Sequence, residues 1–131
     1  MHKEGWKYSI GLLLVIIFGF ILRFLGALWG NINLDEGIHL YDAKLLTEGF
    51  VPFRDYFTRE PYYIYLLSFL VKIFGANLLT SRLLSVIASS LAIPVIYLLG
   101  KNIFSKRIGF IAAIFFALSP FVINETYLGN L

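Results

Sequence analysis

The feature that most constrains this chain is a nearly continuous apolar run from Tyr8 to Trp29. As a helix, its roughly 22 residues reach about 33 Å, which is enough to cross the hydrocarbon core of a bilayer. Lys3 and Lys7 precede the run, as basic residues precede a secretory signal. A signal's apolar core is shorter, however, and no clear small-residue cleavage site follows here. We therefore expect an uncleaved transmembrane helix, in which Arg23 lies near enough to the far interface to snorkel.

The composition agrees with a membrane protein. Hydrophobic residues make up 59% of the chain and charged residues 15%, a balance that is unusual for a water-soluble domain of this size. The net charge is +3, but the basic residues are scattered among apolar runs, so nucleic-acid binding is not expected. The absence of cysteine excludes disulfides, thiolate metal sites and cysteine nucleophiles. Membrane lipids are the expected surroundings, in a plasma or ER-type membrane.

Three more apolar segments follow, and their charges indicate which of them cross the membrane. Segments 80–100 and 108–127 each offer about 20 residues, which predicts a hairpin of two spans. Segment 61–75 reaches only about 22 Å. Basic residues at the N-terminus and in the connection 101–107 favour the cytoplasm, so an even number of crossings must separate them. Spans 8–29 and 80–100 supply that number, and the short segment is then an interfacial helix.

The sequence thus predicts an all-α integral membrane fold with three transmembrane helices and a cytoplasmic N-terminus. Residues 30–79 would form an extracytoplasmic loop that carries two amphipathic juxtamembrane helices, at about 34–48 and 61–75. In the first of these, Asn33 can cap the start and Gly49 can end the helix, with apolar residues at helical spacing between them.

The loop also concentrates charge. It holds six of the eight acidic residues: Asp35, Glu36, Asp42, Glu48, Asp55 and Glu60. Asp35, His39 and Asp42 are spaced so that they project from one face of a helix. A divalent metal can use such a face, with His39 and Asp42 as ligands, although the same spacing also occurs on ordinary solvated helices. Arg54 and Asp55 follow Pro52 in a turn and are free to pair locally.

An ordered set of motifs carries a resemblance to a known family. The set comprises Asp35-Glu36, Tyr41, Ala43, Gly49, Pro52-Phe53-Arg54-Asp55-Tyr56-Phe57, Glu60-Pro61-Tyr62-Tyr63, Phe74-Gly75, Arg82-Leu83-Leu84-Ser85 and Ala117-Leu118-Ser119-Pro120. In this order the set resembles the dolichyl-phosphate-mannose protein mannosyltransferase and aminoarabinose transferase superfamily of type C glycosyltransferases. The resemblance extends from about residue 20 to the end of the chain.

The resemblance implies an enzyme that takes a sugar from a polyprenyl-phosphate donor and transfers it, outside the cytoplasm, to a protein or lipid acceptor. Members are several times longer, so residues 1–131 would be the N-terminal portion, and we expect this portion to be inactive alone. The family's active-site acid corresponds to Asp35, with Glu36 beside it. A carboxylate there can take the proton of the attacking hydroxyl. Arg54 or Arg59 would meet the phosphate, because Arg suits bidentate phosphate contacts.

The remaining candidates for substrate binding are Tyr41, Asp55 and Glu60, which belong to the same motifs. Other readings stay open. Asp35 and Glu36 can simply complement the dipole of a helix that begins beside them. Tyr41, Tyr62 and Tyr63 can anchor the chain at the membrane interface, and Arg82 is expected to cap the outer end of its span. A small non-enzymatic membrane protein that binds a partner helix or lipid through its loop helices is the alternative function. A transporter half is disfavoured, because only one ionisable residue lies deep in a span.

Overall fold

The computed structural model describes residues 3–31 and 33–127, apart from the side chains of residues 3–5, 125 and 127. In this part of the chain the structure is all-helical, with no strand. The helices are α1 (Lys3–Trp29), α2 (Leu34–Thr47), α3 (Pro61–Phe74), α4 (Leu78–Ile103), α5 (Lys106–Leu118) and α6 (Pro120–Tyr127). The all-α expectation is confirmed.

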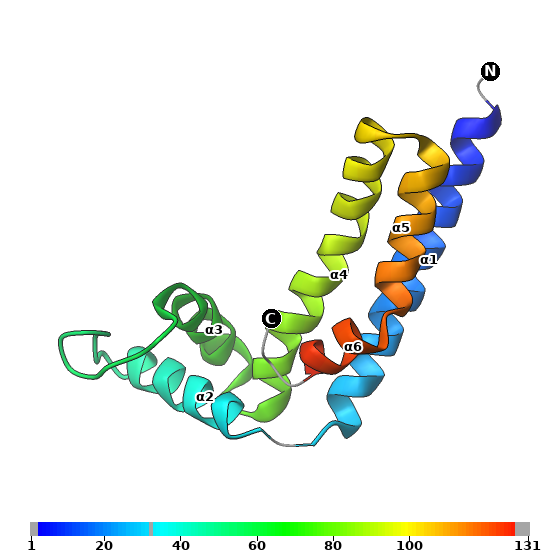
Figure 1. Ribbon diagram of the computed structural model, residues 1–131. Helices are drawn as coiled ribbons and strands as arrows, with labels where there is room; N and C mark the ends of the chain where they lie inside the picture. The colour runs from blue at the N-terminus through cyan, green and yellow to red at the C-terminus, as the bar shows by residue number, and fades with distance from the viewer. Residues whose placement is uncertain (1–2, 32, 128–131) are drawn as a thin grey trace.

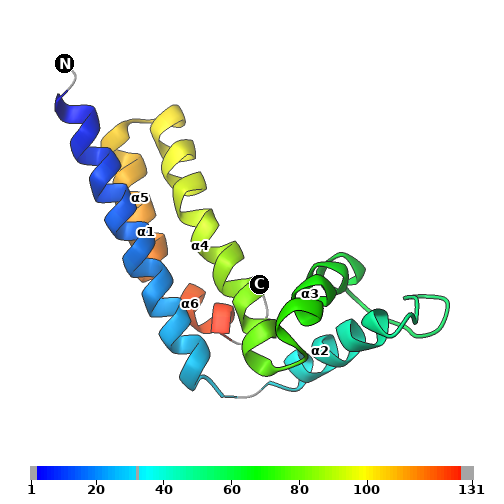
Figure 2. The ribbon, with the colours of Figure 1, turned by 180° about the vertical axis from the view of Figure 1, so that it is seen from behind.

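The helices form two groups. Helices α1, α4 and α5 lie side by side as a bundle, while α2 and α3 pack on each other beyond one end of it (Figure 1). The start of α1 and the turn between α4 and α5 lie together at the opposite end, as the reverse view also shows (Figure 2). The basic residues at these two places therefore occupy the same end of the bundle. Helix α3 does not run along the bundle.

Two helices of the described chain are long and apolar enough to cross a membrane, Trp6–Trp29 and Leu78–Ile103. The predicted third span over residues 108–127 is wrong. The chain leaves the helix at Ser119, whose φ of −60° and ψ of 116° are extended, and α6 begins at Pro120. A proline disfavours helical geometry in the residue before it and lacks the N–H that a continuing helix needs. The 13 residues of α5 reach only about 20 Å.

Arg23 of α1 compensates for this break. Its guanidinium donates to the carbonyl of Phe116 at 3.2 Å and to that of Ala117 at 3.1 Å. Pro120 has no N–H to offer the Phe116 carbonyl, so the arginine supplies the missing donor. The side chain is fully buried, also donates to the Gly19 carbonyl at 3.0 Å, and lies 5.6 Å from the centre of the Phe116 ring. The expectation that Arg23 snorkels is therefore wrong.

The hairpin of α4 and α5 is closed by two glycines. A Cβ added at Gly109 would lie 2.5 Å from the Tyr97 carbonyl oxygen and 2.6 Å from the Lys101 nitrogen. A Cβ at Gly100 would lie 2.6 Å from the Cα of Gly109. These are backbone atoms, which cannot move aside as the end of a side chain can. The two helices approach this closely only because neither carries a side chain at the contact.

Gly109→Ala is therefore expected to push α4 and α5 apart and to destabilise the protein by about 1–3 kcal/mol, as overpacked contacts do. The measurement is the thermal unfolding midpoint of the detergent-solubilised protein. Gly37→Ala is the matched control, because a Cβ on that helical glycine meets nothing within 4 Å. Equal midpoints for the two variants would contradict the close contact between the helices.

Candidate functional site

Helix α2 forms the base of the site. Its first turn is capped by the Asn33 side chain, which accepts a hydrogen bond from the Asp35 N–H at 3.5 Å. Its end is set by Gly49, whose φ of 98° favours glycine. The apolar face of α2 packs on α3 through Ala43, which is buried in one cluster with Ile64 and Leu67. The polar face, with Asp35, His39 and Asp42, is thereby left toward the segment that precedes α3.

A buried ion pair fixes α2 to the membrane-spanning helices. Arg82, in the second turn of α4, donates from Nε and Nη2 to the two carboxylate oxygens of Glu36, at 2.6 and 3.0 Å. Its other N–H groups reach the carbonyls of Ala27 at 2.7 Å, Gly30 at 3.1 Å and Asn31 at 3.0 Å. All five donors of the guanidinium are thus used. Arg82 is 4% exposed and Glu36 fully buried, so the pair is shielded from water.

This arrangement decides what Glu36 can do. Its carboxylate is enclosed and bound by Arg82, and it does not line the pocket described below. It therefore anchors the start of α2 and, through the adjacent backbone, sets the position of Asp35. Arg82 lies near the start of α4, but it joins α1, α2 and α4 rather than capping its own helix.

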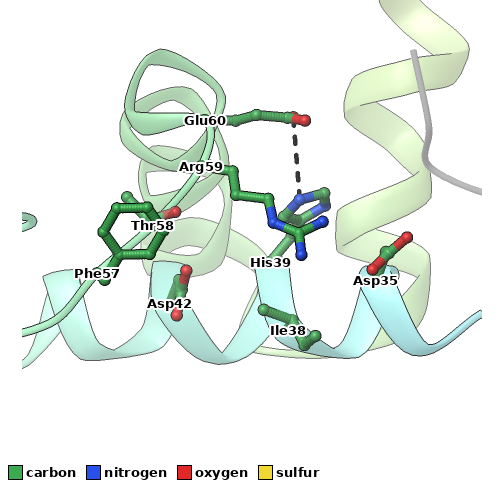
Figure 3. Close-up of a pocket in the computed structure, with 8 residues that line it drawn as sticks. All are labelled: Asp35, Ile38, His39, Asp42, Phe57, Thr58, Arg59 and Glu60. Atoms are coloured by element: carbon green, nitrogen blue, oxygen red, sulfur yellow. Dashed lines mark ion pairs between the residues drawn. The ribbon is translucent and has the colours of Figure 1, made fainter.

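A pocket of about 370 Å³ lies between α2 and the segment 57–60 (Figure 3). It is lined by Asp35, Ile38, His39, Asp42, Phe57, Thr58, Arg59 and Glu60. Five of the residues singled out in the sequence come together here, three from α2 and two from the segment before α3. The sequence motifs thus converge on one concave site, which is the usual form of a small-molecule site.

His39 lies in the middle of the pocket. Its Nε2 is 3.9 Å from a carboxylate oxygen of Glu60, and its ring meets the Tyr63 ring edge-on with centres 5.1 Å apart. The side chain is 14% exposed, and Nδ1 is buried without a partner in the described part of the chain. Burial raises the pKa of the Tyr63 hydroxyl further above physiological pH, so this neighbour carries no charge.

Arg59 and Asp42, like Asp35, are charges of the pocket without an ion pair. Within residues 3–31 and 33–127, neither side chain makes an ion pair shorter than 4.0 Å. Arg59 is exposed, whereas Asp42 is only 6% exposed. The Tyr56 hydroxyl donates to the backbone carbonyl of Asp42 at 3.0 Å, which ties the loop to α2. Burial, and then the charge of Asp42, raise the pKa of the Tyr56 hydroxyl.

The divalent metal considered from the sequence stays a prediction. Among the described side chains, no group of three His, Asp or Glu residues lies close enough to hold a metal ion. His39 and Asp42, the two ligands considered, do line one pocket.

Besides Glu36, three predicted site residues lie outside the pocket. Arg54 and Asp55 pair with each other at 2.7 Å in the exposed turn after Pro52, as the sequence suggested. A hydrogen bond from Arg54, followed by one from the Val51 N–H, lowers the pKa of the Asp55 carboxyl. Tyr41 is 62% exposed and does not line the pocket. Roles of these three in substrate binding remain predictions.

Some pocket residues were not found from the sequence. Ile38, Phe57 and Thr58 line the pocket, yet no pattern of charge or spacing singles them out. The partnership of Glu36 with Arg82 was also missed. A signal existed for that pair, since an arginine at the start of an apolar span requires a partner when it is buried.

Comparisons with known proteins now add a second line of information. A family model described as dolichyl-phosphate-mannose-protein mannosyltransferase matches residues 58–131, which is more than half of the chain. Comparison with curated proteins and with solved structures gave no significant match. Together with the apolar helices, the family match defines an integral membrane protein of the glycosyltransferase class. The chain belongs to the dolichyl-phosphate-mannose-protein mannosyltransferase family.

The match covers part of the site. It begins at Thr58 and so includes three pocket residues, Thr58, Arg59 and Glu60, and also Arg82. It does not include α2 with its carboxylates. The role of Asp35 therefore rests on its motif and its position in the pocket.

Removal of one partner from the buried pair should be strongly destabilising. Arg82→Met leaves the Glu36 carboxylate buried without its cation, which is expected to lower the free energy of unfolding by about 3–5 kcal/mol. The measurement is an SDS titration of the protein in mixed micelles. The double variant Arg82→Met/Glu36→Leu should recover part of the loss, because no charge remains buried.

Arg54→Met is the control for this experiment, since its ion pair with Asp55 lies in the exposed turn. Little change is expected there, because exposed pairs contribute little to stability. An Arg82 variant as stable as the Arg54 variant would show that the buried pair does not hold α2 in place.

Proposed function

We propose that this chain forms part of a membrane glycosyltransferase that transfers a sugar from a polyprenyl-phosphate donor to a protein or lipid acceptor. The observation that carries the proposal is the pocket, which combines two unpaired carboxylates, Asp35 and Asp42, with one unpaired guanidinium, Arg59. Such a transfer needs a proton acceptor for the attacking hydroxyl and a cation for the departing phosphate. The family membership supports the reaction class.

Asp35 is the proposed general base. It is exposed and lines the pocket, and its carboxylate makes no ion pair with a described residue. The acceptor oxygen attacks the anomeric carbon and gives its proton to Asp35, while the bond from that carbon to the phosphate oxygen breaks. The leaving group is the polyprenyl phosphate. Arg59 would stabilise the charge that develops on it, since guanidinium groups match phosphate oxygens in geometry.

The proposed orientation places the N-terminus in the cytoplasm and the pocket outside it. The basic residues Lys101, Lys106 and Arg107 lie at the same end of the bundle as the start of α1, which supports a common cytoplasmic side under the positive-inside rule. The pocket then lies at the other end, where α3 would rest in the outer interface with its exposed Tyr62 and Tyr65.

Asp35→Asn should lower the turnover of the full-length protein by about 100-fold or more, which is the usual contribution of a general base. The assay follows radiolabelled mannose from dolichyl-phosphate mannose into acceptor in membrane vesicles. Because the amide keeps the shape of the side chain, protein level and thermal stability should not change.

Glu48→Gln is the matched control, because this exposed acid follows α2 outside the pocket. Its turnover should equal that of the wild type. Full turnover in Asp35→Asn would remove this carboxylate from the mechanism.

A further inference from the structure

The end of the pocket near Phe57 holds a buried carboxylate that has no partner within the described chain. Asp42 is 6% exposed, yet its side chain makes neither a hydrogen bond nor an ion pair there. Its negative charge is instead directed to the pocket that it lines. The carboxylate oxygens are not among the fully enclosed polar atoms, so they meet water through the pocket, and such partial removal of a charge from water is costly. A ligand that satisfies Asp42 would remove this cost.

Thr58 adds a second group of the same kind. It is 3% exposed, and its hydroxyl has no hydrogen-bond partner among the residues that the structure describes. Asp42 belongs to α2 and Thr58 to the loop before α3, and Figure 3 places both at one end of the pocket with Phe57. Phe57 is 78% exposed, and its ring meets the Phe53 ring edge to face with centres 5.9 Å apart. This end therefore offers one carboxylate, one hydroxyl and one exposed aromatic ring.

The charges around this end limit what it can bind. A carboxylate only accepts hydrogen bonds, so the ligand must donate them. Lys44, the nearest lysine along α2, is occupied by Glu48 at 3.8 Å. Arg59 lies, along α2, between Asp42 and Asp35 (Figure 3). An anionic group would be repelled by Asp42 and attracted toward Arg59. The Phe57 end therefore suits an uncharged group that is rich in hydroxyls.

We infer that Asp42, Thr58 and Phe57 form the subsite for the sugar ring of the donor, an assignment that rests on the proposed glycosyl transfer. Hydroxyls of the sugar ring donate hydrogen bonds to the Asp42 carboxylate, and one of them forms a hydrogen bond with the Thr58 hydroxyl. The apolar face of the sugar ring packs on the Phe57 side chain. The donor then lies along α2 with its phosphate at Arg59. Asp35 lies seven residues before Asp42, about 10 Å along the helix, which leaves space for the acceptor hydroxyl at the anomeric carbon.

The assignment is tested by binding, which does not require turnover. Affinities of the full-length protein in nanodiscs are measured for dolichyl phosphate, dolichyl-phosphate mannose and dolichyl-phosphate glucose. The wild type should prefer at least one sugar-bearing lipid over the bare lipid phosphate. Asp42→Asn should reduce that preference about tenfold, since a hydrogen bond to a charged group is lost, and should not lower the affinity for dolichyl phosphate, because only a repelling charge is removed. Thr58→Val should act in the same direction.

Two controls separate the possible failures. Arg59→Gln should weaken all three lipids together, because it acts on the phosphate, and Glu48→Gln should change none of them. Reduced affinity of Asp42→Asn for all three lipids alike, or an unaltered sugar preference, would overturn the subsite while the proposed reaction stands. A wild type that binds none of the lipids would remove the proposed function itself.

Discussion

The structure depends first on the guanidinium of Arg82. Helices α2 and α3 lie beyond the end of the bundle, where hydrophobic packing against α1 and α4 is limited. The ion pair with Glu36 and the three carbonyl contacts at the end of α1 connect these parts across the short link 30–33. Removing two charges from water is costly, and the attraction repays this only when every donor is matched. Here all five N–H groups of Arg82 have an acceptor. Because two of them bind Glu36, the orientation of α2 is fixed at its first turn.

A second arginine, Arg23 of α1, has the same kind of role at the break between α5 and α6. Pro120 ends α5 and cannot give the Phe116 carbonyl its usual helical donor, and the buried Arg23 donates to this carbonyl and to that of Ala117. In both places an arginine in an apolar helix satisfies the backbone where a helix begins or ends. Neither one is exposed to a ligand. In the pocket, by contrast, Asp35, Asp42 and Arg59 make no ion pair with a described residue, which separates these candidates for chemistry from the two structural arginines.

Much of the fold could be predicted from the sequence, because apolar length and helix caps are local signals. Residues 34–48 and 61–75 were expected as helices and form α2 and α3 within a residue or so at their ends. The third span failed because apolar length was weighed without Pro120. Helix α4 continues through Pro94, so the presence of a proline does not by itself predict where a helix ends. What differs at Pro120 is that Arg23, distant in sequence, supports the break, and only tertiary structure shows that.

The sequence predicted several residues of the site but not the separate role of each one. Spacing placed Asp35, His39 and Asp42 on one face, and the structure brings Arg59 and Glu60 to that face. Glu36, one residue from Asp35, is turned instead to Arg82, because adjacent helix positions point about 100° apart. Thr58 and Phe57 have no distinguishing pattern and enter the site only through the path of the loop before α3.

The central claim is that the whole of α2 and α3 lies on one side of the membrane. Since the chain has no cysteine, single-cysteine variants can be labelled without background. Tyr62→Cys and Phe74→Cys mark the two ends of α3, and Lys101→Cys marks the opposite end of the bundle. With an impermeant maleimide outside intact cells, the account predicts labelling at both ends of α3, and at Lys101→Cys only after permeabilisation. Labelling of the two ends of α3 from opposite sides would contradict it.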